Sequence, residues 1–204
     1  MPLNQYFRDG LSILIEPSVF FKTRYPDFSL SQSLALGITV SWVSAIIDAI
    51  IHYLRPPSHS NAFDKAKDLL SHLPLLKNMP KIFWTQSFET NAWLKLSLYP
   101  FQALLTFFMY GFIFYWGARA FGSKGVLRDT VKITAIASAA HLVSSICFFL
   151  PYGLTSLIGW LFYIGILTCG FTLVLNISRV RAILVTFLPS LITLILFLGF
   201  AVLN

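Results

Sequence analysis

Charged residues are scarce in this chain of 204 residues: only 11% are Asp, Glu, Lys or Arg, whereas 56% are hydrophobic. Soluble domains usually have about a quarter charged residues, so this composition argues against an ordinary soluble enzyme. Disorder is excluded as well, because 20 Phe, 8 Tyr and 5 Trp are more aromatic surface than a solvated chain leaves in water. The class that remains is an integral membrane protein.

Cysteines and catalytic motifs are also scarce. Cys147 and Cys169 both fall inside long apolar runs, so we expect buried thiols and neither a disulfide framework nor a metal site. The chain lacks the His-Glu-x-x-His, Gly-x-Ser-x-Gly and Gly-x-x-x-x-Gly-Lys motifs, and we therefore expect no enzyme activity, no metal and no cofactor. Ser138 and His141 have a Ser-x-x-His spacing, which leaves an intramembrane hydrolase as a minor alternative.

Long apolar runs are what the sequence does contain. A helix needs roughly 20 residues to cross a hydrocarbon core of about 30 Å. Five runs approach or exceed this length: 30–54, 97–118, 133–150, 153–176 and 182–203. Pro151 and Gly153 supply the break for a tight hairpin between the third and fourth runs, although a single re-entrant element there is a competing interpretation. The prediction is an all-α bundle of five transmembrane helices over 30–204, with an outer loop at 55–96.

The positions of Lys and Arg predict the orientation of the bundle. Basic residues lie before the first span, in the loop 119–132 and directly after the fourth span, and five crossings place all three segments on one face. The outer loop is basic too, but long segments are translocated with less regard to charge. We therefore expect a cytoplasmic N-terminus and an outward C-terminus. The net charge of +7 then reflects cytoplasmic loops and anionic lipid, and we expect no nucleic-acid partner.

Residues 1–29 predict an amphipathic cytoplasmic or interfacial segment. Apolar residues repeat at helical spacing, with polar residues opposite: Phe7, Leu11, Leu14 and Ile15 against Arg8, Asp9 and Ser12. A helix in the headgroup layer and a helix packed on the bundle both fit this pattern. The outer loop carries a similar apolar face from Phe63 to Leu73, which predicts a second amphipathic helix.

Polar residues inside the spans form one stripe on each of three helices. The stripes contain Ser44, Asp48 and His52 in the first span, Ser138, His141 and Ser145 in the third, and Thr186, Ser190 and Thr193 in the fifth. Asp48 and Ser145 fall at a similar depth, so we expect them to meet. One interpretation is a polar cleft for an ion, proton or lipid headgroup, because buried charge in a membrane is costly. The other is hydrogen bonding between helices.

The loop after the second span is rich in glycine and basic residues. Gly122-Ser123-Lys124-Gly125 fits a weak phosphate site on backbone amides, an anionic-lipid contact or a plain turn with a capped helix. Candidate contacts for anionic lipid or a protein partner are Lys124, Arg128, Lys132, Arg179 and Arg181.

The order of these features resembles the Yip-domain family, five-span proteins named for Ypt/Rab-interacting proteins. The matching segments are PSVFF from Pro17, FGSKGVLRDT from Phe121, ASAAH from Ala137 and NISRVRA from Asn176, followed by Pro189. The resemblance implies a cytosolic N-terminus, an outward C-terminus and no enzyme activity. Family members often have Pro where His141 stands, which leaves their helix kink in doubt here. Only about 29 residues precede the first span, so the chain is more similar to prokaryotic members, and Rab binding is not carried over.

The function expected from these features is non-enzymatic organisation of membrane lipids or partner proteins, including a homo-oligomer. The alternative is a small transporter, channel or lipid-moving protein that uses the polar cleft around Asp48 and His141.

Overall fold

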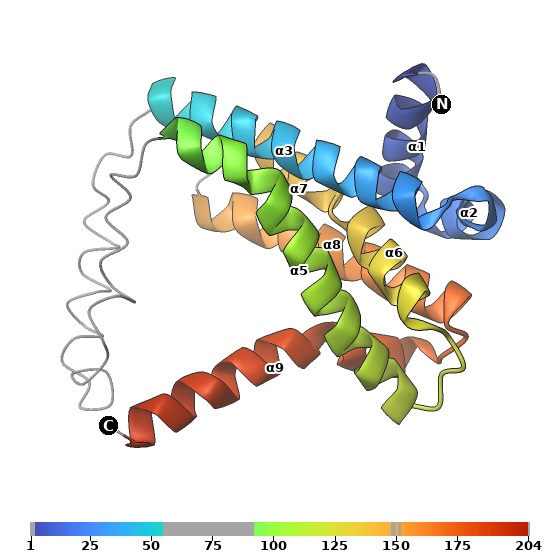
Figure 1. Cartoon of the computed structure of the whole chain (residues 1–204). Helices are drawn as coiled ribbons and strands as arrows, with labels where there is room; N and C mark the ends of the chain where they lie inside the picture. The colour runs from blue at the N-terminus through green and yellow to red at the C-terminus, as the bar shows by residue number, and fades with distance from the viewer. Residues whose placement is uncertain (1–2, 55–91, 148–149, 151, 204) are drawn as a thin grey trace.

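The computed structural model describes residues 3–54, 92–147, 150 and 152–203, and within these ranges it contains helices joined by short turns and no strand. Its elements are α1 (Leu3–Ile15), α2 (Pro17–Thr23), the 3-10 turn η1 (Tyr25–Asp27), α3 (Leu30–Leu54), α5 (Ala92–Ala120), α6 (Leu127–Ala137), α7 (Ala140–Ile146), α8 (Tyr152–Val174) and α9 (Arg179–Leu203). The long helices run back and forth along the bundle, and the two termini lie at opposite ends of it (Figure 1). The predicted outer loop, with its second amphipathic helix, falls at 55–91 and lies outside the described residues.

Three helices of the described chain are long and apolar enough to cross a membrane: α3 over Leu30–Ile51, α5 over Leu96–Ala120 and α8 over Leu154–Val174. They confirm three of the five predicted spans. The predicted third span is not one continuous helix, because α6 ends at Ala137 and α7 covers only Ala140–Ile146. The predicted fifth span coincides with α9, which contains Pro189.

Ser138 causes the break between α6 and α7. Its hydroxyl donates to the backbone oxygen of Ala135 at 2.7 Å and to that of Gly37 on α3 at 3.2 Å. The amides of Ala139 and His141 bond three residues back instead of four, at 3.1 and 2.9 Å, so the chain tightens into a 3-10 turn. A serine hydroxyl that competes for helix carbonyls bends a helix in this way. A kink therefore exists here without the proline that family members often have.

Helix α6 forms the core of the bundle. Every residue from Thr130 to Ala140 is buried, and α6 packs against α3, α5 and α8. Glycines permit these close crossings: a Cβ on Gly37 would lie 2.6 Å from the Ala135 oxygen, and one on Gly111 would lie 2.6 Å from Val131. The Thr130 hydroxyl also donates to the Gly111 oxygen at 2.8 Å, which ties α6 to α5.

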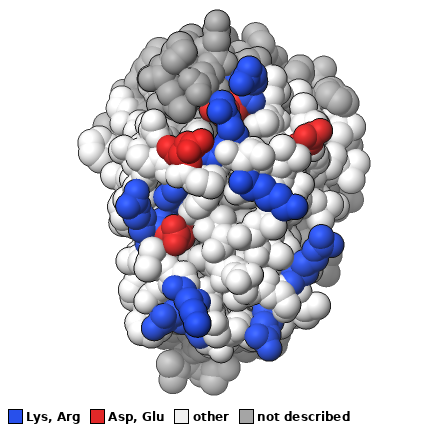
Figure 2. All heavy atoms as spheres, turned by 90° about the vertical axis from the view of Figure 1, so that its right-hand side faces the viewer, with Lys and Arg blue, Asp and Glu red and all other residues white. Residues whose placement is uncertain are grey.

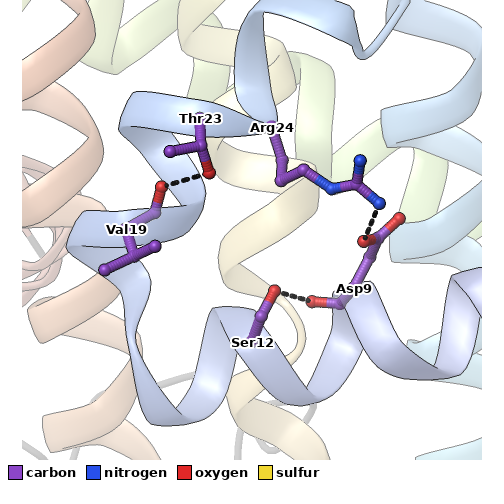
Figure 3. A network of polar contacts seen from close by, with 5 residues as sticks. All are labelled: Asp9, Ser12, Val19, Thr23 and Arg24. Atoms are coloured by element: carbon purple, nitrogen blue, oxygen red, sulfur yellow. Dashed lines mark hydrogen bonds and ion pairs between the residues drawn. The ribbon is translucent and has the colours of Figure 1, made fainter.

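The N-terminal segment packs on the bundle. Ile13, Phe20 and Phe21 are buried, and Phe21 fits against Gly170 of α8, where a Cβ would lie 2.8 Å from the ring. Arg24 pairs with the buried Asp9 at 3.2 Å and so joins α1 to the turn after α2 (Figure 3). The packed alternative is therefore what the structure shows. It also leaves an apolar edge exposed, formed by Leu11, Ile15 and Val19.

Candidate functional site

One end of the bundle gathers basic side chains. This basic end is formed by α1, α2, the end of α5, the loop 121–126 and the starts of α6 and α9, and Figure 2 shows Lys and Arg spread across it among fewer acidic groups. Four of the predicted contact residues are exposed there: Lys124, Arg128, Arg179 and Arg181. Arg181 also donates to the Phe121 oxygen at 3.1 Å, which holds the start of α9 against the loop.

The Gly122–Gly125 loop caps α5 and is hydrogen-bonded to the segment that follows α8. Gly122 has a φ of 86°, and the amides of Gly122 and Ser123 bond back to Arg119 and Ala118 at 3.0 Å, a Schellman cap on α5. The Ser123 hydroxyl donates to the Leu175 oxygen at 3.2 Å and accepts from the Gly125 amide at 3.0 Å. Since the amides of Gly122, Ser123 and Gly125 already have partners, they do not cradle a phosphate, and the loop forms a turn that caps α5.

Lys132 does not belong to the exposed basic set. It is only 5% exposed, and its ammonium lies 3.9 Å from the centre of the Tyr25 ring. The Tyr25 hydroxyl donates to Asp129 at 3.2 Å, and burial, followed by the Asp129 charge, raises the pKa of Tyr25. Lys132 thus fastens the N-terminal segment to α6.

The polar stripe of α3 meets that of α7 in a serine seam, formed by Ser44, Asp48 and Ser145. The hydroxyls of Ser44 and Ser145 lie 2.6 Å apart and are buried. Ser145 also donates to the Asp48 carboxylate at 3.0 Å, so the expected contact between these two residues is present. The side chains of His52 and Thr193, which were predicted to join this site, lie outside the described residues.

The polar stripe of α9 does not join the serine seam. It lines a separate hollow, which we call the central cleft. This cleft of about 890 Å³ lies between α5, α8 and α9, with the α6–α7 junction along one wall. Its polar lining includes Ser138, His141, Thr186 and Ser190 from the predicted stripes, together with Tyr110 and Tyr163. The three stripes therefore do not enclose one site, because Ser145 faces α3 while Ser138 and His141 line the cleft. His141 stacks on Tyr163 at 6.1 Å between ring centres.

A family model, the Yip1 domain, matches residues 11–201. The chain belongs to the Yip1-domain family. No curated protein and no solved structure matches the chain.

The motifs that carried the resemblance have structural positions in this Yip1-domain protein. The PSVFF run forms α2 and inserts Phe21 against α8, and the glycine-basic loop caps α5. The ASAAH run is the α6–α7 break. Asn176 has a φ of 56°, the left-handed conformation that asparagine tolerates after a helix, and it turns the chain from α8 to α9.

Some site residues were missed by sequence reasoning. Tyr110 and Tyr163 lie within apolar runs and resemble ordinary core aromatics, so no signal separates them. Within the described part of the chain, no three His, Cys, Asp or Glu side chains lie close enough to hold a metal ion. Cys147 and Cys169 are half-buried free thiols.

Proposed function

We propose that this Yip1-domain protein is a non-enzymatic, five-crossing protein of a bacterial inner membrane, whose basic end faces the cytoplasm and gathers anionic lipid. The alternation of α3, α5, the α6–α7 pair, α8 and α9 supports five crossings, as does the position of the termini at opposite ends (Figure 1). The α6–α7 pair extends from Leu127 to Ile146 and α9 has 25 residues. At about 1.5 Å per residue, each reaches about 30 Å or more.

The observation that carries the proposal is the set of exposed cations at the basic end. Its members are Arg8, Lys22, Arg119, Lys124, Arg128, Arg179 and Arg181. Cytoplasmic loops are enriched in Lys and Arg, and each such residue near an anionic leaflet contributes about 1 kcal/mol. The exposed apolar edge formed by Leu11, Ile15 and Val19 suits a position beside the headgroups.

Charge reversal at the loop tests this proposal. The full-length protein is extracted with its surrounding lipid in polymer-bounded discs, and the ratio of phosphatidylglycerol to phosphatidylethanolamine is compared with that of the bulk membrane. We expect enrichment of phosphatidylglycerol around the native protein, and loss of that enrichment in the Lys124→Glu, Arg128→Glu double variant. The matched control, Lys124→Arg with Arg128→Lys, keeps the charge and should keep the enrichment. An unchanged ratio in the reversed variant overturns the proposal.

The basic end could organise proteins instead of lipids, by binding a protein partner or a second copy of the chain. Crosslinking from Lys124 in the same discs distinguishes protein binding from lipid binding. Adducts with protein that disappear on charge reversal, in the absence of any lipid enrichment, would favour this form.

The central cleft favours a second candidate function, a transporter, channel or lipid-moving protein. A hollow of about 890 Å³ with several hydroxyls and an imidazole on its walls is large enough for a small ligand. His141→Ala in proteoliposomes discriminates the two functions, because His141 lines the cleft. A transporter loses flux or its pH dependence in this variant, whereas a lipid organiser loses only some stability.

A further inference from the structure

A second hollow, the side groove, lies between α2, α8 and α9 and measures about 450 Å³. It is separate from the central cleft, although α8 and α9 contribute to both. One end of it opens at the basic end, and the rest follows the apolar surface of α8 and α9. A groove that is cationic at one end and apolar along its length has the polarity of a phospholipid.

The cationic end of the groove is formed by Lys22 of α2 and Arg179, the first residue of α9. Both side chains are exposed. Among the described residues neither has a hydrogen bond or an acidic partner, in contrast to Arg24, which pairs with Asp9. No acidic side chain lines the groove in the described part of the chain. Two unneutralised cations that converge on one hollow favour an anionic group between them.

Two threonine hydroxyls inside the groove lack partners. The side-chain oxygens of Thr168 and Thr172 are buried and have no hydrogen bond within the described chain. Threonine in a helix commonly bonds the carbonyl of the preceding turn, so these two side chains are unusual. A buried hydroxyl without a partner is costly. The two lie one helical turn apart, and a ligand with ester or glycerol oxygens at this depth would bond both.

The apolar part of the groove follows α8 away from the basic end. Leu161 and Ile164 of α8 and Ile183 of α9 line it. From Leu161 to Thr172 the groove follows about 16 Å of helix. A Cβ placed on Gly165 would meet no atom within 4 Å, so the groove is open directly beside the α8 backbone.

We propose that the side groove binds one anionic phospholipid. The phosphate lies between Lys22 and Arg179, the Thr168 and Thr172 hydroxyls bond the oxygens of the glycerol and ester region, and an acyl chain lies along Gly165. This site deepens the proposed lipid function, since it rests on the basic end facing an anionic leaflet. A free phosphate fits less well, because it would leave the apolar length of the groove empty.

Filling the groove tests the site. The full-length protein is placed in nanodiscs of phosphatidylcholine with a minor fraction of phosphatidylglycerol, and retained lipid is counted by native mass spectrometry. The native protein should retain one phosphatidylglycerol in preference to phosphatidylcholine. Gly165→Phe, which adds a ring in open space, should reduce this retention about tenfold. Leu157→Phe, on an exposed part of α8 outside the groove, is the matched control and should retain the lipid.

Two further variants separate binding from folding. Thr168→Val with Thr172→Val keeps side-chain shape and removes hydroxyls that have no protein partner, so melting temperature should be unchanged or higher while lipid retention falls. Lys22→Gln with Arg179→Gln should abolish the preference for phosphatidylglycerol. Competition with inorganic phosphate should leave the bound lipid in place, and displacement by phosphate would indicate a headgroup site only.

The proposed site is overturned by unchanged retention in Gly165→Phe, or by equal retention of phosphatidylcholine in the native protein. The Lys124 and Arg128 variants lie outside the groove, so they report separately on the basic end. If charge reversal at Lys124 and Arg128 abolishes the phosphatidylglycerol enrichment while the Gly165→Phe variant retains its bound lipid, the groove site is disproved and the proposed function stands. If the native protein shows no enrichment but Gly165→Phe loses the one bound lipid, the proposed function is disproved and the groove site stands.

Discussion

The ammonium of Lys132 lies 3.9 Å from the centre of the Tyr25 ring and 3.5 Å from the backbone oxygen of Tyr25. The two residues are 107 positions apart in the sequence. Their contact joins the N-terminal segment to α6, the most buried helix of the bundle, so α1 and α2 are held in place by the core itself.

Removing the ring should leave a buried cation without its partner. We expect Tyr25→Leu to lower the free energy of unfolding by about 2 kcal/mol more than Tyr25→Phe, because Phe keeps the ring face beneath the ammonium. Thermal unfolding in detergent measures the difference. In the Lys132→Met background the two substitutions should differ far less, and an equal difference in both backgrounds would contradict the cation–π contact.

Tyr25 also predicts a pH dependence of stability. Burial and the Asp129 charge raise the pKa of Tyr25. Above about pH 10 the folded chain therefore keeps a proton that the unfolded chain releases, and stability falls, by at most about 1.4 kcal/mol per pH unit.

The Tyr25→Phe variant isolates this contribution. Above about pH 10 the melting temperature of the native protein should fall relative to that of Tyr25→Phe, because the variant has no hydroxyl to titrate. Parallel curves for the native protein and Tyr25→Phe would show that the hydroxyl titrates equally in the folded and unfolded chains.

The crossing of α3 and α6 should not tolerate a side chain at Gly37. A Cβ there would lie 2.6 Å from the Ala135 backbone oxygen, so Gly37→Ala should destabilise the protein by about 1–3 kcal/mol. Gly10→Ala is the matched control, because its Cβ would meet no atom within 4 Å. In the middle of α1 it should gain about 0.5–1 kcal/mol from helix propensity. Equal melting shifts for both variants would disprove the close crossing.

The serine seam should contribute modestly to stability. Ser145→Ala removes the bonds to Ser44 and Asp48, and we expect a loss of about 0.6–1.7 kcal/mol, the range for bonds between membrane helices. Ser144→Ala, one residue earlier and facing the central cleft, should change the melting temperature little. A loss at Ser144 as large as that at Ser145 would contradict the assigned bonding.

The fold could be predicted as far as apolar runs define helices. The first span was predicted at 30–54, and α3 covers Leu30–Leu54, because a continuous apolar run bounded by polar residues is sufficient to define a membrane helix. The break at Ser138 was missed. It depends on a hydroxyl bonded both to its own helix and to Gly37 of another, and a single-helix pattern does not contain that second partner.

The candidate site was predictable where two regular helices meet. Helical phase and depth were enough to bring Asp48 and Ser145 together. They were not enough to place Ser138 and His141 at the central cleft, because that cleft is formed by α5, α8 and α9, whose packing around the α6–α7 junction is not contained in the pattern of a single helix. The burial of Lys132 was missed as well, since its partner comes from a distant segment that covers the end of α6.

The central claim is that the basic end faces the cytoplasm, with an odd number of crossings between it and the C-terminus. A dual reporter fused after Asn204 tests this most directly: a periplasmic phosphatase is active only outside, and a fluorescent protein folded in the cytosol is active only inside. We expect phosphatase activity and no fluorescence at Asn204, with the reverse for a reporter inserted after Lys124. Fluorescence at both positions would show that the basic end and the C-terminus lie on the same side of the membrane, and would disprove the proposed topology.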